Sequence, residues 1–205
     1  MTTRKAWFGP SKAAIWQQLC EEIDADFIPG GRWRKDDIKV RAYHREWVFT
    51  LDTYTVSNGK TSTTYTRMRA PYVNWDDFQF RIYRRHIFSG IGKAFGVKDI
   101  EVGFPEFDKD FIIQGNDTRK LQMFFENPHI RELVQLQPKI LFEIRRDSGW
   151  FADKYPEGVN ELYFQVVGII RDLDRLLDLY DLFAEVMDHL CEIGTAYEDK
   201  PGLLY

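Results

Sequence analysis

The sequence has little of what marks a secreted, zinc-binding or membrane protein. Its only two cysteines, Cys20 and Cys191, are far apart, so they provide neither a disulfide framework nor the paired spacing of a zinc site. The first residues lack the apolar stretch of a signal peptide, and no apolar run is long enough to span a bilayer. These absences favour a cytoplasmic protein without a transmembrane segment.

Motifs for catalysis and for phosphate binding are missing as well. The sequence has no G-x-S-x-G nucleophile motif, and none of its four histidines lies in an H-E-x-x-H zinc motif. The glycine-rich stretch at 89–96 departs from a Walker loop at Ile87 and Ala94. Glu185 and His189 lie one helical turn apart, a spacing more typical of an ion pair than of a metal site. We therefore expect no metal, no cofactor and no recognisable catalytic residue.

The composition is that of a folded protein with an uneven charge distribution. Apolar residues make up 44% of the 205 residues and aromatic residues 16%, which excludes disorder and suits a single domain over 1–205. Residues 30–95 hold 13 Lys and Arg against 6 Asp and Glu, a net charge of +7, whereas residues 150–205 hold 4 against 12, a net charge of −8. Such an asymmetry indicates either an interaction surface or two regions that face each other within one fold.

Two turn signals predict the pairing of the first strands. Ser11 is placed to cap a helix over 12–22, after which the apolar period changes to two. An Arg45-Glu46 loop and an Asn58-Gly59 turn then pair Val40 with Leu51 and Asp52 with Tyr65.

Both pairings place the same residues on the same faces of the sheet. A strand near 78–85 continues the pattern with Phe78, Phe80 and Ile82 inward, so residues 30–95 are predicted to contain a four-stranded antiparallel meander. The core side is Val40, Ala42, Trp47, Phe49, Leu51 and Met68, and the other side is Lys39, Arg41, Tyr43, Thr50, Asp52, Tyr54, Tyr65, Arg67 and Arg69, continued by Gln79, Arg81, Tyr83 and Arg85.

The second half of the chain predicts further strands and three helices. Short strands near 99–104 and 111–114 flank a polar bend. Asn116 or Asp117 caps a helix that begins at about 118, and Pro128 begins a second helix that ends at Leu136. Strands follow near 139–146 and 161–170. A long helix over about 171–193, within an acidic portion at 171–196, has a wide apolar arc and a narrow stripe of acids. The expected fold is α+β, with an antiparallel sheet curved around this helix.

Several phrases resemble an uncharacterised family of bacterial proteins, a domain of unknown function. They are FPEFDKDFIIQGND at 104–117, NPHIRELVQLQP at 127–138 and ELYFQVVGII at 161–170. The resemblance extends over most of the chain and implies no activity.

The strand face opposite the core is the candidate functional site. Arginine supplies paired donors for phosphate or carboxylate, and tyrosine supplies a surface for stacking, so we expect a non-catalytic binding or regulatory module for a polyanion or an acidic protein. There are three alternatives. The face is merely a solvated strand surface, the protein is a hydrolase or transferase with a site built from distant carboxylates and arginines, or it is a structural homodimer joined through the C-terminal helix. The candidate residues are Arg41, Tyr43, Tyr65, Arg67, Arg69, Arg81 and Tyr83, with Arg84, Arg85 and Lys93 at the rim.

Overall fold

A computed structural model describes residues 9–31, 38–74, 76–85, 99–146, 155–198 and 201. Within these ranges the chain forms five helices and nine strands. The helices are α1 (Lys12–Ile23), α2 (Pro105–Asp110), α3 (Thr118–Glu126), α4 (Pro128–Leu136) and α5 (Leu173–Glu192). The strands are β1 (Asp26–Ile28), β2 (Lys39–His44), β3 (Trp47–Ser57), β4 (Ser62–Asn74), β5 (Phe80–Arg84), β6 (Phe111–Gly115), β7 (Leu141–Arg145), β8 (Val159–Val167) and β9 (Ala196–Tyr197).

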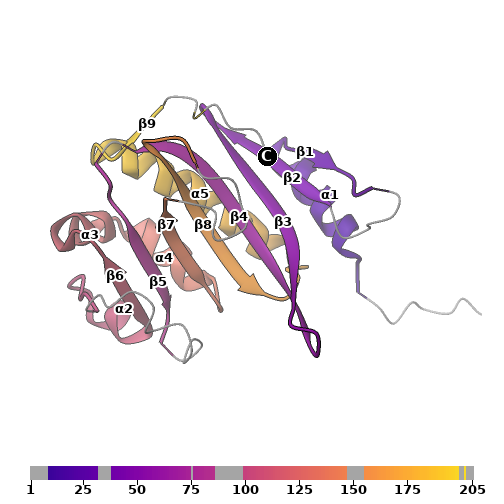
Figure 1. The fold of residues 1–205 in the computed structure, drawn as a ribbon, viewed down its shortest axis with the longest axis horizontal. Helices are drawn as coiled ribbons and strands as arrows, with labels where there is room; N and C mark the ends of the chain where they lie inside the picture. Colours follow the sequence, from indigo (N-terminus) through magenta and orange to yellow (C-terminus); the bar gives the residue numbers. More distant parts are fainter. Residues whose placement is uncertain are drawn as a thin grey trace, which may run out of the picture.

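The described strands form one antiparallel sheet, which confirms the α+β class. Their order is β1-β2-β3-β4-β8-β7-β5-β6, with β9 paired to the end of β4. In Figure 1 the long helix α5 runs behind the strands. The prediction of a four-stranded meander is wrong in its last strand, because β5 pairs with β6 and β7 rather than with β4. Strands β8 and β7, which come much later in the sequence, lie between β4 and β5.

The register of the first hairpin is confirmed and that of the second is shifted. Val40 pairs with Leu51 as expected, whereas Asp52 pairs with Arg67 and not with Tyr65. The side chain of Asn58 causes this difference, because its Oδ1 accepts hydrogen bonds from the backbone of residues 60 and 61 and holds a four-residue loop over 58–61. A shift of two residues keeps every side chain on its predicted face.

Side-chain caps begin four of the five described helices. Ser11, Asp117, Asn127 and Asp172 each accept a hydrogen bond from a backbone N–H in the first turn, which satisfies donors that a helix leaves without partners. Pro128 occupies the first position of α4, where its missing N–H costs nothing. The predicted boundaries of α1, α3, α4 and α5 are therefore confirmed to within a few residues.

The prediction of a strand over 99–104 followed by a polar bend is wrong for the segment before β6. Residues 105–110 form the short helix α2 instead. The carboxylate of Asp108 accepts hydrogen bonds from the backbone N–H groups of Val102, Gly103 and Phe104, at 2.9, 3.0 and 3.1 Å. This carboxylate thus has a structural role, since it folds the preceding residues back onto the helix.

The core lies between the sheet and α5. Phe183, Met187 and Leu190 are fully buried, and the ring of Phe183 meets Phe49 and Phe142 with ring centroids 5.6 and 5.8 Å apart. This confirms the predicted burial of the apolar arc. Most of the apolar arc of α5 is thus covered within the chain itself, while Leu173, Leu177, Tyr180 and Ile193 are half-buried.

The acidic stripe of α5 is exposed at Asp174, Asp181 and Glu192 and half-buried at Asp178, Glu185 and Asp188, so the expectation that Asp188 is exposed is wrong. Asp188 pairs with His44 and Arg45 at 2.9 and 3.0 Å. No helix in the described ranges is long and apolar enough to cross a membrane.

Candidate functional site on the outer face of the sheet

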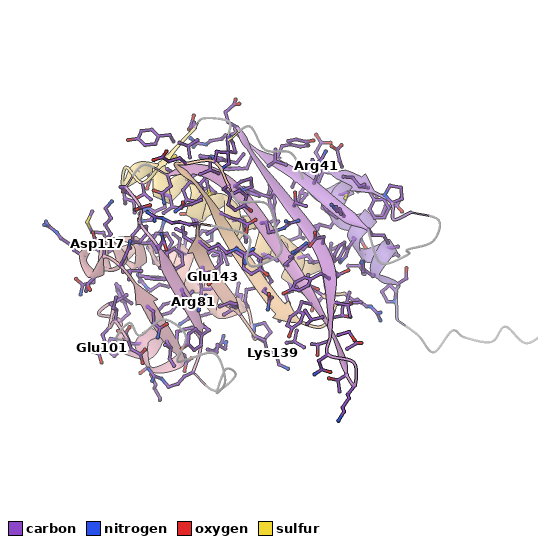
Figure 2. All side chains as sticks on the ribbon, viewed as in Figure 1. Arg41, Arg81, Glu101, Asp117, Lys139 and Glu143 are labelled. Carbon is purple, nitrogen blue, oxygen red and sulfur yellow. The ribbon has the colours of Figure 1, made fainter. Side chains whose placement is uncertain are left out.

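The face of the sheet opposite α5, here called the outer face, carries a continuous row of mostly polar side chains. Strand pairing aligns one residue from each of the seven strands β2 to β8, because opposite positions in neighbouring antiparallel strands point to the same side. Figure 2 labels Arg41 on β2, far from Arg81 on β5, which lies beside Glu143 on β7. The row is Arg41, Thr50, Arg69, Tyr163, Glu143, Arg81 and Gln114.

Asp52 is the centre of the first ion-pair cluster on this face. Its carboxylate accepts two hydrogen bonds from Arg67, at 2.5 and 3.1 Å, and a third from Nη2 of Arg69 at 2.9 Å. The Asp52 side chain is only 5% exposed and that of Arg67 is 26% exposed. The guanidinium of Arg67 is therefore fixed in position while part of it remains open to solvent.

A second cluster joins β5, β7 and β8. Arg81 donates to Glu143 at 2.6 Å, and Arg145 donates to Glu161 at 2.7 Å while its Nη1 lies 3.9 Å from Glu143. Glu161 is completely buried and also accepts the hydroxyl hydrogen bond of Tyr155 at 2.5 Å. Two buried carboxylates thus position two half-buried guanidinium groups.

Tyrosine rings lie against these guanidinium groups. The ring of Tyr54 stacks on that of Tyr65 at 5.2 Å, and the guanidinium of Arg67 lies 4.7 Å from the Tyr54 ring. Arg145 lies in the same way 3.5 Å over the ring of Tyr163. The hydroxyl groups of Tyr54 and Tyr163 both donate to the amide oxygen of Gln165, which links the two clusters.

Burial and charge shift the pKa of several groups on this face. Burial alone would lower the pKa of Arg67, but the hydrogen bonds and charge of Asp52 raise it above its ordinary value. Arg145 follows the same pattern through Glu161. Burial raises the pKa of Tyr54 and raises that of Tyr163 further, so both hydroxyl groups stay protonated at neutral pH and act as donors.

The remaining predicted face residues differ in exposure. Arg41 is half-buried, and Tyr65 and Arg81 are half-buried as well. Tyr43 is 50% exposed and donates to Asp26 at 2.8 Å. Tyr83, which was expected to be available on the face, is buried between its neighbours on β7 and β6, and burial raises its pKa.

The two rim arginines bind helix ends instead of the outer face. Arg84 donates to the backbone oxygens of Gln135 and Gln137 at 2.6 and 3.2 Å, at the C-terminal end of α4. Arg85 donates to the backbone oxygens of Asp108 and Lys109, at the C-terminal end of α2. Cations suit these positions because helix C-termini expose unpaired carbonyl groups. Lys93, the third predicted rim residue, lies outside the described residues.

Asp52 was predicted to lie on the outer face, whereas Glu143 and Glu161 were the carboxylates of this face that sequence reasoning missed. Four arginines of this face (Arg67, Arg69, Arg81 and Arg145) pair with three buried carboxylates (Asp52, Glu143 and Glu161), so much of the positive charge is balanced within the face itself. The net charge of +7 over residues 30–95 therefore overstates the charge of this surface. The sequence predicted strands near 139–146 and 161–170, but it did not say which strands these two would lie beside.

Within the described ranges, no group of three or more His, Cys, Asp or Glu side chains is placed to hold a metal ion. His189 pairs with Glu192 at 2.9 Å rather than with Glu185, whose carboxylate accepts a hydrogen bond from Asn127.

Comparisons of the chain with family models, with curated proteins and with solved structures find no significant match.

Proposed function

We propose that this protein is a non-catalytic binding module that recognises an anionic partner through the outer face, and that single-stranded nucleic acid is the partner that suits this face best. The observation that carries the proposal is the pairing of guanidinium groups with tyrosine rings at Arg67 and Arg145. Both arginines are held by buried carboxylates on rigid strands and remain partly open to solvent.

Rigid placement favours binding because little side-chain entropy is lost when a ligand arrives. A guanidinium group grips phosphate oxygens in pairs, and a tyrosine ring stacks on a base of any sequence. Arg67, Tyr54 and Tyr65 form a stack whose last ring, Tyr65, is half-buried. A base placed on this ring would lie near Arg67, where its phosphate could bind.

Neither alternative function has a specific observation in its favour. A hydrolase or transferase would need carboxylates available for proton transfer, whereas Glu143 and Glu161 are both held in ion pairs with arginine. A homodimer through α5 would need exposed apolar surface, whereas its large apolar side chains are mostly buried within the chain.

The test is a fluorescence titration of single-stranded DNA and RNA oligonucleotides at 50 and 200 mM salt. If Arg67, Arg81 and Arg145 each contact a phosphate, the slope of log K against log salt is about −2, so affinity falls about 20-fold over this range. Arg67→Ala together with Arg81→Ala should flatten the slope to about −0.7. Tyr65→Ala should weaken binding roughly fivefold or more at either salt concentration, because it removes a stacking surface.

Arg119→Ala is the matched control, because Arg119 is exposed on α3, away from the sheet. It should leave both affinity and slope unchanged. Vesicles of anionic lipid form a second arm of the experiment. Binding to vesicles but not to oligonucleotides, or a double variant that binds like the parent, would refute the proposal.

A further inference from the structure

The hairpin of β3 and β4 continues beyond the rest of the sheet as a two-stranded segment, residues 55–64, here called the arm. Within the described ranges, β2 pairs with β3 only as far as Leu51, and β8 pairs with β4 only from Tyr65 onward. The pairing inside the arm continues in regular register to Ser57 opposite Ser62. Figure 1 shows the hairpin extending past the ends of the neighbouring strands. In the described part of the chain, the arm therefore has no neighbouring strand on either side.

The register shows which backbone groups face the open edge of β3. The N–H of Asn58 donates to the backbone oxygen of Thr61 at 3.1 Å, so Asn58 turns its backbone groups toward β4. This direction alternates along an antiparallel strand, so Val56 also turns inward, while Thr55 and Ser57 turn their N–H and C=O groups outward. All residues from 55 to 62 are exposed. Thr55 and Ser57 thus form a strand edge that is open to a further strand.

The edge on the β4 side of the arm is partly closed. The backbone oxygen of Thr64 accepts a hydrogen bond from the N–H of Gly168 at 2.8 Å, just after β8 ends. Only Ser62 keeps its outward groups clear of this contact. The β3 edge is therefore the more open of the two.

The arm lacks the features that commonly prevent strand edges from pairing, which are charges, proline and bulges. Residues 55–64 contain no proline and a single charged residue, Lys60 in the loop, and six of the ten are Thr or Ser. Their register shows no bulge. Val56 carries the one apolar side chain of the arm, is 52% exposed and, two residues after Tyr54, lies on the outer face. Because the β3 edge carries no charge, it does not repel its own copy.

We propose that the arm joins two copies of this chain by antiparallel pairing of their β3 edges. When Thr55 of one copy pairs with Ser57 of the other, the two outward residues of each chain form two hydrogen-bonded pairs with the copy. Val56 then lies directly opposite Val56 of the copy, on the two-fold axis. The same edge serves both chains, so the interface is isologous and closes as a dimer.

The position of Val56 favours a second copy over an unrelated strand. Residues opposite each other between two hydrogen-bonded pairs are the closest across an antiparallel pair, with Cα atoms about 4.5 Å apart. The two valines would therefore shield each other from solvent on an arm that otherwise carries mostly hydroxyl groups. The turn of the copy, residues 58 and 59, would reach residues 54 and 53, just short of Leu51 where pairing with β2 begins. Neither Arg67 nor Arg145 takes part, so the pairing is independent of the proposed nucleic-acid binding.

Sedimentation equilibrium of the full chain tests the pairing. An interface built on two short strand edges is smaller than the roughly 1,200 Å² of stable complexes, so we expect a weak dimer with a Kd of about 0.1–1 mM. The apparent mass should rise from 24.3 kDa toward twice that value as the concentration is raised through this range. A mass that stays at 24.3 kDa up to about 1 mM overturns the proposal.

Val56→Lys and Thr63→Lys are matched variants, because the two positions lie opposite each other in the arm and share a face. In the dimer, the charges introduced at position 56 would face each other directly. Those at position 63 would be three strand spacings apart, about 14 Å, which exceeds the Debye length of about 8 Å at physiological salt. Val56→Lys should raise the Kd of the dimer about fivefold or more, and Thr63→Lys should change it little. Equal effects of the two variants would contradict this register.

Cross-linking tests the identity of the partner. Val56→Cys places two thiols on the two-fold axis at a Cα separation of about 4.5 Å, within the range that a disulfide spans. With oxidised glutathione, this variant should form a covalent dimer of the chain. Thr63→Cys is the control, and the parent, which contains Cys20 and Cys191, gives the background. If Val56→Cys cross-links no more than Thr63→Cys, as expected for random collisions or for an arm that binds a different protein, the proposal is wrong.

Discussion

Glu161→Ala should be among the most destabilising single substitutions on the outer face. The carboxylate is completely buried and accepts hydrogen bonds from Arg145 at 2.6 and 2.7 Å and from Tyr155 at 2.5 Å. Its removal leaves the guanidinium of Arg145 under the sheet surface without its main counter-charge. Breaking a buried pair in this way costs about 3–5 kcal/mol. We expect a loss near 3 kcal/mol, because Arg145 is 22% exposed and keeps Glu143 at 3.9 Å.

A second substitution distinguishes the ion pair from simple loss of packing. Replacing both partners, in the variant Glu161→Leu with Arg145→Met, removes the charges together and fills the space with apolar atoms. Such replacements of a whole buried pair are neutral or stabilising in other proteins. The double variant should therefore recover most of the stability that Glu161→Ala loses, since no isolated charge remains.

Urea denaturation at pH 7 measures both effects. For an m-value of about 3 kcal/mol/M, a loss of about 3 kcal/mol lowers the midpoint by about 1 M with an unchanged slope. Glu132→Ala is the control, because this side chain is 72% exposed and should change stability by less than about 0.5 kcal/mol. A cost below about 1 kcal/mol for Glu161→Ala, or a double variant no more stable than the single one, would contradict a buried pair.

Two further predictions concern α5. Phe183→Ala should lower the free energy of unfolding by about 3–5 kcal/mol because the ring is fully buried, whereas Met123→Ala, at a side chain 43% exposed, should change it little in the same urea assay. Burial, and then the charges of Asp181 and Asp174, raise the pKa of Asp178 above its ordinary 3.8, so its ionised form destabilises the folded state at neutral pH. Asp178→Asn should raise Tm at pH 7 by roughly 1–4 °C, because it removes two like-charge pairs that each cost about 0.2–0.5 kcal/mol. A calorimetric series over pH should show this gain in Tm vanish as pH falls below 3.8, where the carboxyl group is protonated in both states.

Local signals in the sequence predicted the helices well because each signal acts within a few residues. Ser11 and Asp172 bond to N–H groups three residues ahead, and Pro128 needs only its own position to begin α4. The alternation along β2 and β3 is equally local, since burial on one face repeats every second residue. These patterns could be predicted because no distant part of the chain is needed to produce them.

The order of the strands could not be predicted in the same way. Sequential strands lie next to each other about two-thirds of the time, so placing the strand after β4 beside it was the favoured prediction. In the structure, β8 occupies that position, and its pairing with β4 runs from Tyr65 opposite Val167 to Val73 opposite Val159. Partners about 100 residues apart leave no local signal, because either strand would show the same alternation beside any neighbour.

In the second hairpin, one side chain changes the turn and the strand register, yet every residue stays on its predicted face of the sheet. Asn58-Gly59 favours a two-residue turn, but Asn58 Oδ1 instead accepts from the backbone of the two residues before β4. The extra two residues move Arg67 opposite Asp52 in place of Tyr65. The face remained correct because the shift is even, while the ion pair depended on the exact partner and was missed.

Charge counted along a chain and charge on a surface can differ, and the arginines near 81–85 show why. Arg81 points to the outer face and is balanced by Glu143, which is 62 residues away in the sequence. Arg84 and Arg85, counted in the same basic segment, donate to carbonyl oxygens at the ends of α4 and α2. Those oxygens carry only partial charges, and Arg84 also lies 3.8 Å from the carboxylate of Asp110, so a count of acidic residues accounts for only part of what engages these arginines. Under the proposed function, the half-buried guanidinium groups of Arg67 and Arg145, which lie against tyrosine rings, and that of Arg81 would contact the ligand, so substitutions at these three positions test the proposal directly.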